Sequence, residues 1–193
     1  MNSSLRIAVA DDEPDMRDYF QRILPRLGHC VVGAAEDGMR LVELCREAKP
    51  DLVFTDIRMP RMDGIQAAIA IYAERPVPII LVSAHHDSEL IARAEADHVL
   101  AYLVKPIRQA DLPPAIGIAM RRFEQFREVE REAADLREAI EHRRTVEQAK
   151  QSLMRETGAD EPDAFARLRD LAIERQQKLI EAARNILQSE KSG

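Results

Sequence analysis

Val53–Gly64 has the sequence Val-Phe-Thr-Asp-Ile-Arg-Met-Pro-Arg-Met-Asp-Gly. An apolar run ends in Asp56, and a loop marked by proline and glycine follows directly. This pattern predicts a buried strand that carries a carboxylate at its C-terminal edge. Open parallel α/β sheets bind their ligands in the crevice outside this edge. Asp56 is therefore a candidate site residue, provided that other strands bring complementary groups to the same edge.

Three further apolar runs end in polar or charged residues. They are Leu5–Ala10 before Asp11, Asp12 and Glu13, Val77–Val82 before Ser83, and Val99–Val104 before Lys105. Apolar runs that alternate with helical patterns predict a doubly wound parallel sheet. We expect strands at 5–10, 30–34, 51–56, 77–82 and 99–104, and helices at 14–27, 37–48, 63–74 and 87–97. One sheet edge then collects carboxylates, a hydroxyl and an ammonium group.

These groups point to a specific chemistry. Clustered carboxylates raise each other's pKa unless a cation is present. An all-oxygen site with few protein ligands suits Mg²⁺, which keeps several waters and accepts phosphate oxygens. A carboxylate such as Asp56 can act as a nucleophile toward a phosphoryl group, while Lys105 offsets the charge of that group. Each motif alone has a simpler explanation, as a helix N-terminus or an ordinary turn, but coincidence does not explain their meeting at one edge.

In these motifs the sequence resembles the receiver domains of two-component response regulators, over roughly residues 5–120. The resemblance implies a five-stranded, flavodoxin-like α/β fold with Asp56 as the phosphoacceptor and a sensor histidine kinase as the partner. It implies that Asp12 binds Mg²⁺ directly, that Asp11 assists through water and that the main-chain carbonyl of Arg58 completes the protein ligands. Lys105 would pair with the phosphoryl oxygens. Such a chain accepts a phosphoryl group but is not expected to be a turnover enzyme.

The same resemblance assigns a conformational switch. Ser83 stands where the family has the hydroxyl residue that turns toward the phosphoryl group, and Tyr102 stands at the aromatic switch position. The Lys105–Pro106 peptide bond would be cis. His98 departs from the pattern, because receivers usually have glycine there, and histidine tolerates positive φ better than most residues. We expect a modest local cost at His98 and no loss of chemistry.

Composition sets limits on the rest of the chain. The 193 residues suffice for a domain of about 120 residues and a smaller module. No apolar run approaches the ~20 residues that span a bilayer, and the N-terminus lacks a signal-peptide pattern, so we expect a cytoplasmic protein without a membrane partner. Cys30 and Cys45 are expected to be reduced core thiols. His85 and His86 are expected to be a loop pair, because no third soft metal ligand is near in sequence.

The fifth helix is predicted to be unusually long. Asp111 caps it, Pro113 and Pro114 fit its first turn, and no stop signal occurs before Gly158. An apolar seam with heptad spacing follows the receiver part; it consists of Phe126, Val129, Ala133, Leu136 and Ile140. The seam covers only about two heptads, so a solvated connector and contact with the C-terminal helices stay open as alternatives. We expect it to form a homodimer that phosphorylation favours.

The last fifty residues predict a small all-α module of three helices. Gly158 separates the first from the second, which Asp160 caps, and the third carries Leu179, Ala183 and Leu187. This part resembles the ANTAR domain over about residues 136–188, through Arg143-Arg144, Ala149-Lys150, Asp163-Ala164-Phe165, Leu168-Arg169 and Ala182-Ala183. The resemblance implies binding of paired-hairpin RNA that prevents a terminator from forming. We therefore expect three parts: a receiver at 1–120, a connector at 121–142 and an ANTAR-like domain at 143–193.

Charge supports RNA binding only locally. Residues 121–193 contain 15 Lys and Arg against 16 Asp and Glu, whereas residues 143–155 carry four cations against Glu147 alone. The candidate RNA contacts are Arg143, Arg144, Lys150, Arg155 and Arg169. Gln151 departs from the family, which usually has glycine after the Ala-Lys pair. Because one patch supplies few phosphate contacts, useful affinity would need two copies side by side.

The sequence therefore predicts a phosphorylation-controlled, RNA-binding antitermination regulator. One alternative is a response regulator that acts as a protein-binding adaptor. A DNA-binding transcription factor is disfavoured, because the third helix of the module mixes Lys178 and Arg184 with Glu181 and Glu190 and lacks a basic recognition face.

Overall fold

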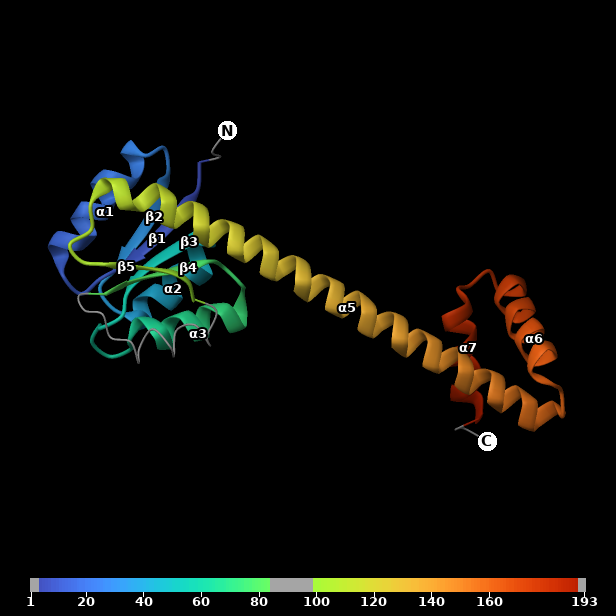
Figure 1. The fold of residues 1–193 in the computed structure, drawn as a ribbon. Helices are drawn as coiled ribbons and strands as arrows, with labels where there is room; N and C mark the ends of the chain where they lie inside the picture. Colours follow the sequence, from blue (N-terminus) through green and yellow to red (C-terminus); the bar gives the residue numbers. More distant parts are fainter. Residues whose placement is uncertain (1–3, 84–98, 191–193) are drawn as a thin grey trace. The chain divides into compact units, whose positions relative to one another are not determined.

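A single parallel sheet organises the N-terminal part of the chain. The structure is a computed structural model that describes residues 4–83 and 99–190. The five strands are β1 (Arg6–Ala10), β2 (Cys30–Ala35), β3 (Leu52–Asp56), β4 (Ile79–Ser83) and β5 (Val99–Val104). They lie in the order β2-β1-β3-β4-β5, and every neighbouring pair is parallel (Figure 1). The predicted doubly wound sheet is confirmed.

Helices cover both faces of this sheet. They are α1 (Pro14–Arg26), α2 (Gly38–Ala48), α3 (Gly64–Glu74) and the first turns of α5 (Leu112–Thr157), which follows a 3₁₀ turn at Gln109–Asp111. Ala8 and Ala10 of β1 face the core beneath α2 and α3, whereas Ile7 and Val9 face the core beneath α1 and α5. This alternation follows from the two-residue period of a strand. The predicted helix at 87–97 and the histidines His85, His86 and His98 lie outside the described residues.

Sheet order explains the burial of the strands. β1, β3 and β4 lie inside the sheet, and nearly all their residues are buried. Strands covered on both faces are continuously apolar, as the sequence indicated. β4 begins at Ile79 instead of residue 77 because Pro78 directly precedes it and has no N–H for the ladder.

The prediction that both cysteines are core thiols was wrong for one of them. Cys45 is buried between α2 and α3, but Cys30 is exposed. Cys30 begins β2, which lies at the edge of the sheet, so no described strand pairs with its outer side. Its strand position was predicted correctly, but the edge placement was not.

The C-terminal part is a separate compact unit, which starts at Glu128, while the first unit extends to Arg127. It contains the rest of α5 together with α6 (Glu161–Glu174) and α7 (Leu179–Glu190). α5 ends before Gly158, whose φ of +71° is in the left-handed region that favours glycine. The core of this unit is small and rich in alanine: Ala149, Leu153, Ala164, Leu168, Ala172, Ala182 and Ala183. None of the helices in the described ranges is long and apolar enough to cross a membrane.

Candidate functional site

Asp56 lies at the carboxyl end of β3, where the chain leaves the sheet. The residue is buried, and its Oδ2 accepts a hydrogen bond of 2.8 Å from the main-chain N–H of Arg58. The following loop returns so closely that a Cβ atom on Gly64 would stand 2.0 Å from the carbonyl oxygen of Asp56. Only glycine fits this approach, and Asp63 then caps α3 in a reciprocal capping box with Gln66. Residues 53–64 therefore hold the Asp56 carboxylate in place through the Arg58 N–H and the close approach of Gly64.

Three acidic residues follow β1 at the same edge. Ligand oxygens of Asp11, Asp12 and Glu13 all lie within 4.8 Å of one another. Asp11 is buried, whereas Asp12 and Glu13 are exposed. The guanidinium of Arg17 in α1 donates to the main-chain oxygens of Asp11, at 2.7 Å, and Asp12, at 3.0 Å. These bonds fix the acidic loop without neutralising its side-chain oxygens directly.

Lys105 joins the two groups of carboxylates. Its Nζ lies 2.9 Å from Asp11 Oδ2, 2.9 Å from Glu13 Oε1 and 3.2 Å from Asp56 Oδ1. Lys105 follows β5, whose last residue pairs with Ser83 of β4, and the Lys105 N–H donates to the Ser83 carbonyl at 2.8 Å. The Lys105–Pro106 peptide bond is cis. Four sequence-distant segments therefore meet at one sheet edge.

Burial and charge shape the ionisation of these groups. Burial raises the pKa of Asp56, and the Asp11 carboxylate raises it further, although the Lys105 ammonium opposes both effects. Burial also raises the pKa of Asp11, against hydrogen bonds from Lys105 and the Glu13 N–H. For Lys105, burial alone would lower the pKa, but the bonds to Asp11 and Glu13 and the neighbouring carboxylates raise it above its usual range. The site holds more negative than positive charge, which favours a bound cation.

The two residues predicted to form the switch lie on neighbouring strands, Ser83 on β4 and Tyr102 on β5. Ser83 ends β4 and is buried, whereas Tyr102 in β5 is half exposed, at 49 %. The role of Glu13 as a partner of Lys105 was not foreseen. Its position next to two aspartates at the same edge was the available signal.

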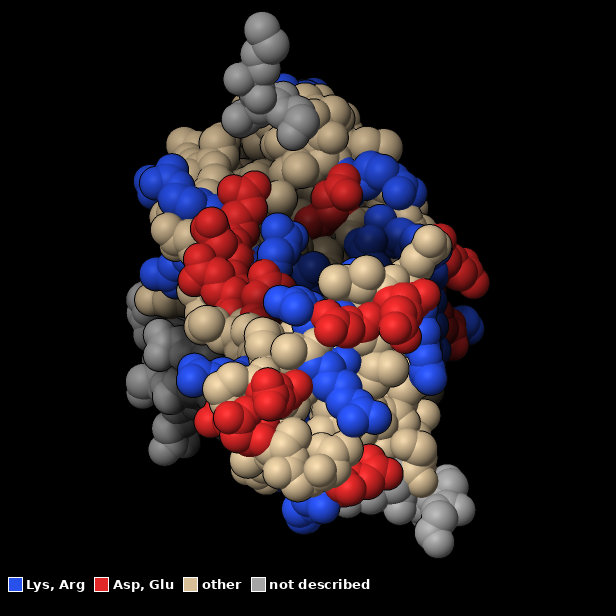
Figure 2. Space-filling view, turned by 90° about the vertical axis from the view of Figure 1, so that its right-hand side faces the viewer, with Lys and Arg blue, Asp and Glu red and all other residues tan. Residues whose placement is uncertain are grey.

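The candidate RNA-contact residues differ in exposure. Arg143, Arg144, Arg155 and Arg169 are exposed, whereas the Lys150 side chain is only 9 % exposed. Lys150 Nζ lies 2.9 Å from Glu147 Oε1 and 2.6 Å from Glu161 Oε1, and 5.9 Å from the centre of the Phe165 ring. The hydrogen bonds to Glu161 and Glu147 raise the pKa of Lys150. Figure 2 shows basic and acidic side chains interspersed on the face that it draws.

The predicted seam is largely exposed. Val129, Leu136 and Ile140 are each more than 60 % exposed, and Ala133 is half-buried. Phe126 is the exception, because its ring lies 6.4 Å from that of Tyr72 in α3, edge to face. Among the described residues, the seam beyond Phe126 therefore keeps an exposed apolar surface.

Comparisons with known proteins match two parts of the chain to domain families. Residues 7–117 match the family of response regulator receiver domains, and residues 134–187 match the ANTAR domain. The transcriptional regulatory protein PdtaR of Mycobacterium tuberculosis is 40% identical over 184 residues, which cover 95% of this chain and 90% of that protein. The signal receiver domain of the putative response regulator NarL from Mycobacterium tuberculosis has a similar structure, with 32% identity and a TM-score of 0.56 over 60% of this chain and 94% of that one.

Proposed function

The chain belongs to the response regulators, with a receiver domain followed by an ANTAR domain, and we propose that phosphorylation of Asp56 controls it. The protein is a two-component response regulator that acts as an RNA-binding antiterminator. Both matched families are signalling domains and not enzyme families. One observation carries the choice of Asp56: this buried carboxylate lies 3.2 Å from an ammonium group and beside an acidic cluster.

The receiver domain implies a histidine kinase as phosphodonor. An Asp56 carboxylate oxygen attacks the phosphorus of the kinase phosphohistidine, the phosphorus–nitrogen bond breaks, and the imidazole keeps the electron pair. The Lys105 Nζ contacts the free Asp56 carboxylate. After transfer, the same ammonium would pair with the phosphoryl oxygens and offset their negative charge. The transfer occurs once per activation and is not a catalytic cycle of this chain.

The donor set at this edge fits Mg²⁺. It consists of oxygen atoms alone, and the buried Asp11 Oδ2 has the Lys105 ammonium as its partner among the described residues. We propose that Asp11, Asp12, Asp56 and the main-chain carbonyl of Arg58 hold the ion, with Asp12 in direct contact. When bound, Mg²⁺ would neutralise carboxylates and phosphoryl oxygens that otherwise repel each other. Glu13 then serves Lys105, with which it pairs in the structure.

Ser83 and Tyr102 are proposed to report phosphorylation to the rest of the protein. Ser83 ends the strand next to Asp56, since Asp56 pairs in register with Val82. A phosphoryl group on Asp56 would draw the Ser83 hydroxyl toward it, and the half-exposed Tyr102 ring would turn inward to fill the space that Ser83 leaves.

The ANTAR domain implies RNA as the binding partner. We propose that Arg143, Arg144, Arg155, Arg169 and Lys150 form the contact surface for hairpin RNA, with the exposed arginines making the phosphate contacts. The burial of Lys150 between two carboxylates favours an additional role, in which it joins the end of α5 to α6 through Glu161. Dimerisation along the exposed seam would place two such surfaces on one RNA.

Phosphorylation at Asp56 is tested with a small phosphodonor and Mg²⁺. The parent protein should acquire a hydroxylamine-labile label, Asp56→Asn should acquire none, and the surface control Asp18→Asn should behave as the parent. A hydroxylamine-labile label that persists in Asp56→Asn would show that another residue is the acceptor. Filter binding of hairpin RNA and duplex DNA to the same preparations separates antitermination from the DNA-binding and adaptor alternatives.

A further inference from the structure

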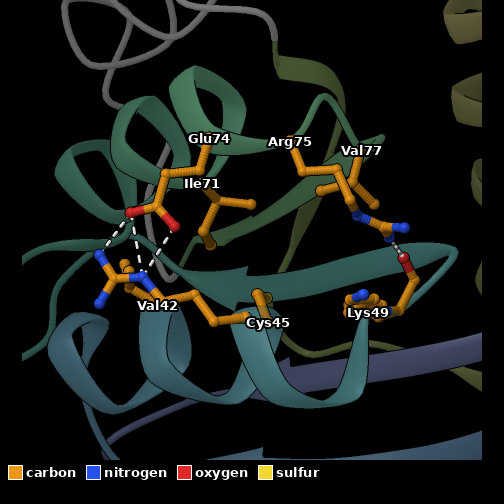
Figure 3. A pocket seen from close by; sticks show the side chains of 9 residues that line it. Val42, Cys45, Lys49, Ile71, Glu74, Arg75 and Val77 are labelled. Atoms are coloured by element: carbon orange, nitrogen blue, oxygen red, sulfur yellow. Dashed lines mark hydrogen bonds and ion pairs between the residues drawn. The ribbon is translucent and has the colours of Figure 1, made fainter.

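A pocket lies between α2 and α3, near the amino ends of β3 and β4, whereas Asp56 lies at the carboxyl end of β3. Its volume is about 300 Å³, at the lower end of the range of small-molecule sites. Pro50 and Val77, which line it, come just before β3 and β4, whereas Asp56 is the last residue of β3. Figure 3 shows its apolar side chains between the two helices. The pocket is therefore separate from the phosphoacceptor site.

A polar contact lies at each end of the pocket. At one end, Arg46 of α2 forms a forked ion pair with Glu74 of α3, with Nε 2.7 Å from Oε2. At the other end, the Arg75 guanidinium donates a hydrogen bond to the main-chain oxygen of Pro50. Both contacts are visible in Figure 3. The volume of about 300 Å³ favours a compact occupant over an extended peptide.

The charge of the pocket is concentrated at one end. Lys49 and Arg75 lie together there in Figure 3, away from the neutralised Arg46–Glu74 pair. Within the described ranges, the Lys49 side chain has no hydrogen bond or ion pair, and Arg75 uses only part of its donor capacity on Pro50. Lys49 and Arg75 therefore line this end of the pocket, and no carboxylate among the described residues pairs with either side chain. An anionic group of a ligand would complete this end.

The middle of the pocket is apolar. Val42, Cys45, Ile71 and Val77 line it, and all four are buried. Burial raises the pKa of the Cys45 thiol to about 12, so the thiol is neutral at physiological pH and adds no charge. The lining favours a hydrocarbon or aromatic body over a polar one.

We propose that this pocket binds a small molecule with an apolar body and one carboxylate group. The apolar body lies on Val42, Cys45, Ile71 and Val77, and the carboxylate meets Lys49 and Arg75. The inference does not rest on the proposed function, because no residue of the pocket belongs to the phosphoacceptor site or to the RNA-contact surface.

Hexanoate is a suitable probe for the full chain, with 1-hexanol and inorganic phosphate as comparisons. The δ1 methyl group of Ile71 reports binding in ¹³C-methyl spectra. Its resonance is assigned because it is missing in Ile71→Val. Hexanoate should shift this resonance saturably and bind at least about tenfold more tightly than 1-hexanol, because a charge-assisted hydrogen bond is added. The proposal would be overturned if 1-hexanol bound as tightly as hexanoate, or if inorganic phosphate bound and hexanoate did not. It would also be overturned if hexanoate caused no saturable shift.

Lys49→Asn is the informative variant. Lys49 has a φ of 47°, which asparagine tolerates well, so the substitution removes the ammonium without straining the helix end. The preference for hexanoate over hexanol should fall about tenfold, whereas the control Lys178→Asn should keep it. An unchanged preference in Lys49→Asn would exclude the assigned anion site. Asp56 labelling and RNA binding are measured separately, so failure here and failure of the proposed function remain distinguishable.

Discussion

At the scale of single residues, backbone approach matters as much as side-chain chemistry. The site needs the Asp56 carboxylate at the end of β3, and the chain must turn there at once to begin α3. Gly64 makes this turn possible, since its N–H donates to the Ile57 carbonyl at 2.9 Å while its α-carbon passes the carbonyl of Asp56. Gly64, which has no functional group, is thus needed to position the proposed phosphoacceptor Asp56.

Gly64→Ala should therefore destabilise the receiver domain by about 3 kcal/mol or more, since the new Cβ meets backbone that cannot move aside. Gly117→Ala is the matched control, because nothing lies within 4 Å of the corresponding Cβ on α5. That control should gain up to about 1 kcal/mol from helix propensity. Urea unfolding of both variants measures the difference. A Gly64→Ala protein as stable as the parent would disprove the close approach.

Cys45 predicts a pH dependence of stability. Its pKa is 9.0 in the unfolded chain and is raised to about 12 by burial, so above pH 9 only the unfolded state ionises. This contribution is fully present below pH 9 and is lost as the pH rises toward 12, by up to about 1.4 kcal/mol per pH unit. Unfolding free energies between pH 8 and 10.5 should fall more steeply for the parent than for Cys45→Ala. Parallel curves would refute the assignment.

At the level of elements, the order of the strands and helices in residues 4–83 and 99–190 followed directly from apolar runs and caps. Gly158 and Asp160 located the break between α5 and α6 because each has a specific backbone role. Contacts between distant segments were harder to predict. The edge position of β2 exposed Cys30, and the ion pairs of Lys150 with Glu147 and Glu161 placed a predicted surface cation inside the module. Periodicity predicts which face of an element is apolar, but it does not predict which neighbour covers that face.

The position of Lys150 can be distinguished from a phosphate contact. Lys150→Ala leaves Glu147 and Glu161 without their shared cation, so it should lower the Tm of the C-terminal unit by a few degrees. It should weaken RNA binding with little change in the salt slope. Arg144→Ala, at an exposed site, should leave the Tm unchanged and lower the salt slope by nearly one unit. Calorimetry and RNA titrations at several salt concentrations test both variants. If Lys150→Ala lowers the salt slope as much as Arg144→Ala does, Lys150 contacts a phosphate directly.

The exposed seam of α5 predicts a dimer. Leu136 is 65% and Ile140 is 64% exposed, and both lie at heptad spacing. Leu136→Glu combined with Ile140→Glu should abolish the dimer in light scattering, because each glutamate would bury a charge in the interface. Ile173→Glu, at an apolar surface residue of α6 outside the seam, is the control. Normal dimerisation of the double variant would exclude the seam as the interface.

For the whole chain, the proposed function requires that phosphorylation in the receiver domain affects RNA binding in the ANTAR domain. α5 is a single helix of 46 residues that begins on the receiver core and ends in the ANTAR core. Phe126 contacts Tyr72 just before the exposed part of the seam starts. A change in dimer population can carry the signal without any change inside the ANTAR domain, because two RNA-contact surfaces on one dimer raise the effective concentration of the second.

This route makes a prediction about coupling. Beryllofluoride with Mg²⁺, as a phosphoryl mimic, should raise both the dimer fraction and the affinity for a paired-hairpin RNA, whereas a single hairpin should gain little because it engages one surface. In Leu136→Glu combined with Ile140→Glu, Asp56 should still be phosphorylated, but the gain on the paired hairpin should disappear. Gln151→Gly should preserve or improve binding if Gln151 only fills the position usual for glycine. If beryllofluoride tightens RNA binding equally in the parent and the double variant, the signal reaches the ANTAR domain within one chain, and dimerisation is not the link.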